Sequence, residues 1–383
     1  MTWLTVFACA VYLLWLVREK RRACRDRAAL KHVIHVNGIR GKSSVSRLID
    51  AGLRAGGLRV FTKTTGSCPA IIGVDGSEKP LHRWGKPSIK EQLRVLGLAV
   101  AQHADVLVIE CMAVLPEYQK TSEEEMLRAD IGVITNVRLD HPEEMGETLD
   151  EIAEALSATI PVHGTLFTAD AAYHDFFADK ALEKGTSVVL SDDPCTPAAN
   201  GIDFAENVSL ALTVCEHLGL ERGMALAGMR QYRKDPGAFN VETMAGKGGC
   251  RIVFLNALAA NDPASSERIL DQVERQGLMA SGKRMLLVNN RHDRPARLRQ
   301  FVDFAVKHDV RFDRIVAAGG CRSLMRRALV KRGVAPERIA FLRSFSELAE
   351  LEEDTVVFAV GNIVGSGRLL AAGDRKAGVF DVR

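Results

Sequence analysis

The first third of the chain shows short apolar segments that end at polar turns and are separated by stretches with helical periodicity. The segment 32–36 alternates in polarity and runs into a glycine turn, after which an amphipathic stretch begins. Two further apolar segments, 104–110 (ADVLVIE) and 129–137 (ADIGVITNV), have the length of buried strands. A regular exchange of strands and helices is typical of an α/β fold with a mostly parallel sheet.

The last third repeats this alternation and predicts a second, smaller α/β domain of Rossmann-like type. Helical stretches begin near Pro263, Pro295, Ser323 and Ser346, and the turn 245–250 (AGKGGC) marks the boundary before them. The glycine-rich segment 361–367 (GNIVGSG) is interpreted as a turn with a substrate role. The strand-like segments are 251–257, 284–290, 314–320 and 355–361.

The N-terminal segment 3–17 carries no charge and has Trp3 and Trp15 near its ends, a pattern typical of a membrane anchor. It is short against the roughly 20 residues that cross a bilayer, so a signal-peptide core and a buried helix remain alternatives. Because basic residues follow it, we expect a single-pass protein of the cell membrane with its catalytic domains on the cytoplasmic side. The expected organisation is an anchor at 1–17, a basic linker at 18–31, a central ATP-binding domain at 32–240 and a C-terminal domain at 245–383.

Charge and cysteine usage exclude some other functions. The 51 Lys and Arg residues nearly balance 48 Asp and Glu residues, so the net charge of +3 gives no reason to expect nucleic-acid binding. The eight cysteines form no Cys-x-x-Cys pair, which disfavours a zinc or redox motif and fits a reducing compartment.

A candidate phosphate-binding loop follows the first strand. Gly38 and Gly41 allow the backbone to turn its N–H groups inward, Lys42 can neutralise phosphate charge, and the Ser43 hydroxyl can bind Mg²⁺. The loop is shorter than the common G-x-x-x-x-G-K-[ST] pattern, and a chance Gly-Lys-Ser turn is the alternative.

The shortened loop G-x-x-G-K-[ST]-[ST] resembles that of the Mur ligase superfamily, and further motifs follow in the order of that family. Glu110 ends one predicted strand and the segment TNVRLDH, which ends in His141, follows the next. Asn207 resembles a family asparagine that approaches the nucleotide, although it could equally be a helix cap. The stretches VFTKTTGSCP, TNVRLDHPEEMGETLDEIAEALSATIP and NNRHDRPARLRQF are most similar to the CapB/PgsB family of poly-γ-glutamate synthase ligase subunits.

Parallel strands present their last residues at one edge of a sheet, so Glu110 and His141 are expected beside the loop. Oxygen chemistry makes Ser43 and Glu110 candidate Mg²⁺ ligands, whereas His141 is assigned through the resemblance. The alternatives are a capping or surface glutamate and a hydrogen-bonded loop histidine. The family's modified lysine has no counterpart between His141 and Thr168, so the sequence leaves open whether a second Mg²⁺ site exists. The expected catalytic residues are Lys42, Glu110 and His141; the nucleotide-binding residues are Asn37, Gly38, Arg40, Gly41, Lys42, Ser43, Ser44 and Asn207; the metal ligands are Ser43, Glu110 and His141; and the substrate-binding residues are Lys63, Asn261, Arg291 and Arg294.

The resemblance implies an ATP- and Mg²⁺-dependent ligase that activates a carboxylate as an acyl phosphate, which an amine then attacks. The implied substrates are glutamate and the poly-γ-glutamate chain of a capsule. The implied partners are a membrane, integral-membrane synthase or export subunits, and further copies of the chain in a homo-oligomer. A membrane-anchored P-loop kinase acting on a hydroxyl, and a non-catalytic ATP-binding scaffold, are the competing hypotheses.

Overall fold

The computed structural model divides the chain into two compact units, Met1–Asp235 and Pro236–Arg383. Each unit has its own sheet and its own hydrophobic core. The structure describes residues 2–66, 69–81, 83, 85, 87–192, 202–235, 239–260, 262–292 and 295–362.

The first unit is built on a sheet of eight strands within its described residues, in the order β4-β3-β2-β5-β1-β6-β7-β8. Two short strands at one edge, β3 and β4, are antiparallel, and the remaining neighbours pair in parallel. The strands are β1 (His32–Asn37), β2 (Val60–Thr64), β3 (Ala70–Ile72), β4 (Glu78–Pro80), β5 (Val106–Glu110), β6 (Ile131–Ile134), β7 (Thr165–Thr168) and β8 (Ser187–Leu190).

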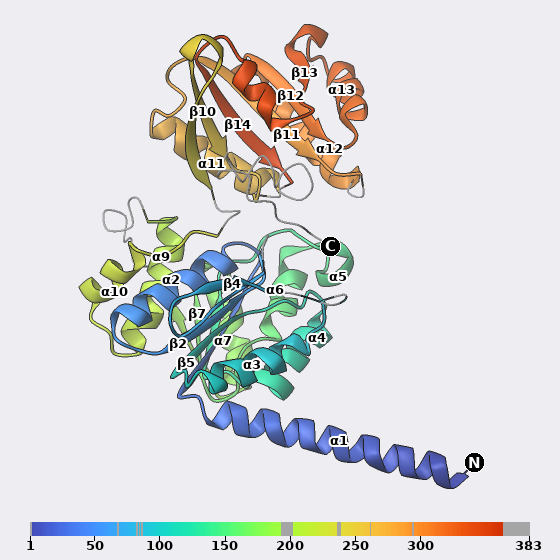
Figure 1. Cartoon of the computed structure of the whole chain (residues 1–383), viewed down its shortest axis with the longest axis vertical. Coiled ribbons are helices and arrows are strands. Elements are labelled where there is room, and N and C mark those ends of the chain that lie inside the picture. The colour runs from blue at the N-terminus through green and yellow to red at the C-terminus, as the bar shows by residue number, and fades with distance from the viewer. Residues whose placement is uncertain are drawn as a thin grey trace. The chain divides into compact units, whose positions relative to one another are not determined.

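Helices cover both faces of this sheet because successive residues of a buried strand point to opposite sides (Figure 1). Ile34 and Val36 of β1 pack in the core with α2, α9 and α10, whereas Val33 packs on the other side with α3. The helical segments are α2 (Lys42–Ala55), α3 (Glu91–Ala101), α4 (Pro116–Lys120), the π-helix η1 (Thr121–Leu127), α5 (Pro142–Met145), α6 (Leu149–Ser157), η2 (Ala171–Tyr173), α7 (His174–Leu182), α9 (Ala205–His217) and α10 (Arg222–Met229).

Strand order brings the sequence motifs together. β1 lies between β5 and β6, with Val36 opposite Glu110 and Asn37 opposite Ile134. The carboxyl ends of these three strands therefore meet at one edge of the sheet, where α2 also begins. The predictions that β1 leads into the glycine loop and that Glu110 ends its strand are both confirmed.

The N-terminal prediction is wrong. Residues 2–28 form one continuous helix, α1 (Thr2–Ala28), so the expected basic linker is largely helical. In the part of the chain that the structure describes, no helix combines the length and the apolar run that crossing a membrane requires. The uncharged run 3–17 spans only about 22 Å as a helix, against roughly 30 Å of bilayer core, and the rest of α1 is strongly charged. The expected single-pass anchoring in the cell membrane, with cytoplasmic catalytic domains, is overturned by this finding.

The charged end of α1 joins the rest of the first unit through ion pairs and hydrogen bonds. The Arg27 guanidinium lies 2.6 Å from Asp130 and donates a hydrogen bond of 2.9 Å to the Arg128 carbonyl. Lys20 reaches Glu125 at 3.3 Å and Lys90 reaches Glu19 at 3.5 Å.

The second unit contains a six-stranded sheet in the order β13-β12-β11-β14-β10-β9, counted over its described residues. Its strands are parallel except that β9 pairs antiparallel with β10, so the expected α/β class is confirmed. The segment near Ser346 forms a short 3₁₀ turn, η6 (Phe345–Glu350), and not the expected helix. The other elements are β9 (Asn240–Ala245), η3 (Lys247–Gly249), β10 (Arg251–Asn256), α11 (Pro263–Arg275), β11 (Lys283–Asn290), α12 (Pro295–Lys307), η4 (Asp309–Arg311), β12 (Arg314–Gly319), α13 (Arg322–Lys331), η5 (Pro336–Arg338), β13 (Ile339–Phe341) and β14 (Thr355–Gly361).

Candidate functional site

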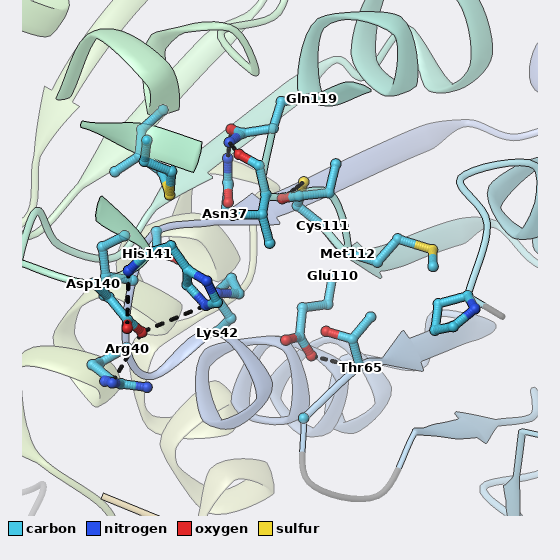
Figure 2. A pocket seen from close by; sticks show the side chains of 18 of the residues that line it. Asn37, Arg40, Lys42, Thr65, Glu110, Cys111, Met112, Gln119, Asp140 and His141 are labelled. Carbon is cyan, nitrogen blue, oxygen red and sulfur yellow. Dashed lines mark hydrogen bonds and ion pairs between the residues drawn. The ribbon is translucent and has the colours of Figure 1, made fainter. Parts of the chain in front are cut away.

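A cavity of about 310 Å³ lies at the carboxyl edge of the first unit's sheet. The glycine loop, the end of β5 and the segment after β6 form its walls, and Figure 2 shows their side chains converging. The residues that line it include Asn37, Gly38, Arg40, Lys42, Thr65, Gly66, Arg83, Glu110, Cys111, Gln119, Asp140 and His141.

Glycine is required at the start of the loop for both space and backbone conformation. Gly38 has a φ of 117°, in the region that side-chain-bearing residues rarely adopt. A Cβ atom there would lie 2.1 Å from Thr135 Oγ1 and 2.8 Å from the Thr135 backbone nitrogen. The loop can therefore pass this close to the segment after β6 only with glycine at position 38.

The end of the loop presents the N-terminus of α2 to the cavity. Gly41, with a φ of 82°, precedes the helix, and no side chain of the described residues caps it. Lys42 Nζ donates a hydrogen bond of 2.7 Å to the Gly38 carbonyl, so the ammonium group folds back over the loop. Uncapped helical N–H groups beside an ammonium group form a site suited to phosphate.

Glu110 joins two sides of the cavity. Its carboxylate oxygen Oε2 accepts hydrogen bonds from Ser43 Oγ at 2.8 Å and from the Thr65 backbone nitrogen at 2.6 Å (Figure 2 shows Thr65 facing Glu110). The backbone also approaches closely at Gly66, where a Cβ would lie 2.6 Å from Ser43 Oγ. Glu110 is 2 % exposed, which makes it a buried acid in a polar setting and not the surface or capping glutamate of the alternative interpretation.

The oxygen atoms of Ser43 and Glu110 suit a shared magnesium ion. Two ligands at right angles around Mg²⁺, each about 2.0–2.1 Å from it, lie about 2.9 Å apart. Ser43 Oγ and Glu110 Oε2 lie 2.8 Å apart as hydrogen-bond partners, a separation that would also allow both oxygens to bind one ion. A hydroxyl and a carboxylate are also the oxygen donors that Mg²⁺ prefers. The residues present therefore fit the implied ion.

His141 lines the same cavity, and its own contacts are to two neighbouring carboxylates. It has a φ of 51°, precedes α5, and lies 3.8 Å from Asp140 and 3.6 Å from Glu144. Asp140 in turn pairs with Arg40 at 3.1 Å. Over the described residues, no three His, Cys, Asp or Glu side chains gather closely enough to hold a metal. The metal-binding role of His141 thus stays a prediction.

Two asparagines expected at the nucleotide have structural contacts. Asn37 Nδ2 donates hydrogen bonds to Gln119 Oε1 at 2.7 Å and to Thr159 Oγ1 at 3.1 Å, which fixes the end of β1. Asn207 lies inside α9 and donates to Asp203 Oδ1 at 2.8 Å, so it is not the cap of that helix. Its side-chain oxygen would lie 2.7 Å from a Cβ placed on Gly41, so it adjoins the loop. Ser44 is partly exposed in the first turn of α2.

The expected substrate-binding residues are divided between the two units, and their shared role stays a prediction. Lys63 is fully buried in β2, where its ammonium group pairs with Glu91 at 3.1 Å, so it has no exposed surface for a substrate. Arg291 is partly buried directly after β11 in the second unit. Asn261, Arg294 and most of the segment 361–367 lie outside the described residues.

Sequence reasoning missed several residues of the cavity. Thr65 enters through its backbone nitrogen, a contact that carries no side-chain signal. Cys111 was predictable in position because it follows Glu110 directly, and it adjoins the buried His35. Arg83 lies between β4 and α3 in a segment without periodicity or motif, so nothing in the pattern distinguished it from a surface arginine.

Comparison with known proteins gives the family. Residues 241–373 match the family model described as "Poly-gamma-glutamate synthase CapB C-terminal domain". The chain is 36% identical over 381 residues to "PGA synthase CapB" of Bacillus subtilis (strain 168), covering 96% of both chains. It is 33% identical over 376 residues to "Capsule biosynthesis protein CapB" of Bacillus anthracis, covering 94% of this chain and 80% of that protein.

The fold is also found among solved structures. One is the bifunctional folylpolyglutamate synthase/dihydrofolate synthase of Yersinia pestis, complexed with AMPPNP and a Mn ion. It matches with a TM-score of 0.62 at 14% identity and covers 95% of this chain and 97% of that chain. At this identity the likeness shows the fold alone. The end-to-end identity with the two CapB proteins, however, shows that this chain belongs to the CapB family of poly-γ-glutamate synthases.

Proposed function

We propose that the chain is an ATP-dependent amide ligase that extends poly-γ-glutamate by adding glutamate to the terminal γ-carboxylate. The observation that carries the proposal is the hydrogen bond between the Ser43 hydroxyl and the Glu110 carboxylate, in a cavity that Lys42 also lines. Within a member of the CapB family, this arrangement supports a site for ATP with Mg²⁺ and for a carboxylate that accepts the terminal phosphate.

The chemistry requires activation because a carboxylate is a poor electrophile. A γ-carboxylate oxygen attacks the γ-phosphorus of ATP, the bond to the β-phosphate oxygen breaks, and ADP leaves. The glutamate amine then attacks the acyl carbon of the resulting acyl phosphate, phosphate departs, and the nitrogen loses a proton. The products are one amide bond, ADP and phosphate, and no protein nucleophile is needed.

The chain's own groups supply position and charge. The N–H groups at the start of α2 and the Lys42 ammonium group bind the phosphates and offset the charge that develops during transfer. Ser43 and Glu110 would hold the metal, with His141 as a further candidate ligand. Mg²⁺ bound there supplies additional positive charge at the transferring phosphate. Arg40, Asn207 and Ser44 complete the surroundings of the loop.

A kinase acting on a hydroxyl would share the phosphate loop but would need no amine. The membership of the CapB family favours the ligase, since relatives of this chain are described as poly-γ-glutamate synthases. Synthase or export subunits and self-association stay predictions from the resemblance.

The test is an assay of ADP release by the full chain, together with proteins that co-purify with it. ATP, Mg²⁺ and a short γ-linked glutamate oligomer are supplied with and without free glutamate. The proposal expects ADP release that depends on glutamate and a product longer by one γ-linked residue. AMP in place of ADP, or phosphorylation of a hydroxyl, would contradict it.

A further inference from the structure

Arg83 is a positive group in the wall of the cavity, which Arg40 and Lys42 of the loop also line. It lies between β4 and α3 and lines the cavity together with Thr65, Gly66 and Glu110. Its side chain is 23% exposed, so most of it is packed while part of it remains open. This placement puts a guanidinium group in the wall of the same cavity as Glu110.

Glu91 orients this guanidinium group. Arg83 Nε donates a hydrogen bond of 2.7 Å to Glu91 Oε2, and Arg83 Nη2 donates one of 3.1 Å to Glu91 Oε1. Such a two-point contact fixes the plane of the guanidinium group. It uses two of the five N–H donors of arginine and leaves the others for a second partner.

Lys63 stands on the other side of Glu91. Its ammonium group lies 3.1 Å from Glu91 Oε1 and donates to Gln92 Oε1 at 3.2 Å, with no exposure to solvent. Burial lowers the pKa of Lys63, and the nearby Glu91 carboxylate reverses this lowering only in part. Burial also raises the pKa of Glu91, but the hydrogen bond from Arg83 and the charge of Lys63 outweigh this and bring it below its usual value.

The cluster holds its charges in fixed positions. Two cations, Arg83 and Lys63, share the anion Glu91, and Lys63 also interacts electrostatically with the Glu110 carboxylate. Gln92 also donates to the Glu110 carbonyl at 3.4 Å, which ties the cluster to the end of β5. A fixed planar cation with spare donors, in the same cavity as the candidate metal ligand, matches a carboxylate better than any neutral group.

We propose that Arg83 binds the α-carboxylate of the terminal residue of the acceptor chain and thereby sets its γ-carboxylate toward the phosphate. This inference rests on the proposed function and adds a specificity-determining residue to it. Every residue of a γ-linked glutamate chain retains a free α-carboxylate, so the acceptor always offers this group. Lys63 and Glu91 are positioning residues that act through Arg83. The other oxyanion in reach is a phosphate of ATP, and the experiment separates the two.

The test measures binding, so that it does not depend on turnover. The dissociation constant of a γ-linked glutamate oligomer is determined by calorimetry with a non-hydrolysable ATP analogue and Mg²⁺ present. Arg83→Gln should weaken oligomer binding about 10- to 100-fold, the range for losing a charge-assisted contact. The same variant should bind the ATP analogue as the unchanged protein does, which also shows that the cavity is folded.

Two comparisons sharpen the result. Arg94→Gln removes an exposed arginine of α3 outside the cavity lining and should leave both constants unchanged. An oligomer whose terminal α-carboxylate is replaced by an amide should bind the unchanged protein weakly. Its affinity for Arg83→Gln should be equally weak, because the contact with Arg83 is already missing. Unchanged oligomer binding by Arg83→Gln, or a loss confined to the ATP analogue, would overturn the inference.

Failure of the proposed function is distinguishable. If oligomer binding depends on Arg83 but no glutamate-dependent ADP release is found, the ligase function is refuted and the binding role of Arg83 is supported. Glutamate-dependent ADP release, together with oligomer binding that Arg83→Gln does not weaken, would support the ligase and refute the role of Arg83.

Discussion

Ser43 Oγ and Glu110 Oε2 lie 2.8 Å apart, although 67 positions of sequence separate the two residues. The contact joins the first turn of the helix after the glycine loop to the last residue of the neighbouring strand. It exists because β5 pairs beside β1 in a register that sets Glu110 opposite Val36. The phosphate loop and the candidate metal ligand are thus held by the sheet itself.

Replacing Glu110 with glutamine should weaken the metal site. The amide oxygen can still accept a hydrogen bond, but the negative charge that favours Mg²⁺ is lost. We expect the apparent Mg²⁺ affinity, measured by titration in the presence of a non-hydrolysable ATP analogue, to fall at least about tenfold, or roughly 1.4 kcal/mol. Glu117→Gln, at an exposed position in α4, is the matched control. Equal Mg²⁺ affinity in both variants would remove Glu110 from the metal site.

Lys42→Ala should lower the rate of glutamate-dependent ADP release about 10²- to 10³-fold, the usual effect of removing one group that stabilises developing charge. Lys79→Ala removes an exposed lysine of β4 outside the cavity lining and should change the rate little. Similar rates for the two variants would show that the ammonium group at position 42 does not serve the reaction.

Gly38→Ala tests the loop's close approach to the segment after β6. Gly57 has a φ of 81°, and a Cβ atom there would meet no described atom within 4 Å, so Gly57→Ala carries the backbone strain without the collision. Both variants should lose about 1 kcal/mol of stability from the positive φ. The collision with Thr135 should lower the free energy of unfolding of Gly38→Ala by about 1 to 3 kcal/mol more, as measured by urea unfolding. Gly38→Ala should also bind the ATP analogue poorly. An equal loss of stability in the two variants would show that a methyl group fits at position 38 without a collision.

His35 makes the stability of the first unit depend on pH. Burial lowers the pKa of His35, but its interactions with Cys111 and Glu123 outweigh burial and raise the pKa from 6.5 to about 9. Its Nδ1 lies 2.7 Å from Glu123 Oε2, and both side chains are buried. Because the folded-state pKa is the higher one, this stabilisation is fully present below pH 6.5 and is lost as the pH rises through 9.

The expected change is about 3 kcal/mol between pH 6.5 and 9.5, measured by urea unfolding. His35→Gln should be less stable at pH 6 and should lack most of this decline. The control is His103→Gln, at an exposed position after α3, which should retain the decline of the unchanged protein. A decline of equal size in His35→Gln would refute the assignment.

Much of the first unit follows from local sequence signals. The segment 32–36 and Gly38 predict a strand and a tight turn, because alternation and glycine act on the residues that carry them. The end of β5 at Glu110 is equally local. These predictions hold because each depends only on the residues that carry the signal.

The failures have physical causes of another kind. The uncharged run at the N-terminus reads as an anchor by composition, but it continues without a break into a charged helix whose end is paired with Asp130. In the sequence Lys63 looks like a free cation, whereas the fold buries it against Glu91, which belongs to a helix later in the chain. Arg83 becomes visible only when the cavity is formed. Long-range pairing of charges carries no local periodicity, so a single sequence does not reveal it.

The acyl-phosphate route is tested most directly by following oxygen. The acceptor oligomer is labelled with ¹⁸O in both oxygens of its terminal γ-carboxylate and incubated with ATP, Mg²⁺, glutamate and the full chain with its co-purifying proteins. If the carboxylate is phosphorylated, each phosphate released carries one ¹⁸O atom as the amide bond forms. Phosphate without the label, in a reaction that still lengthens the oligomer, would contradict the account.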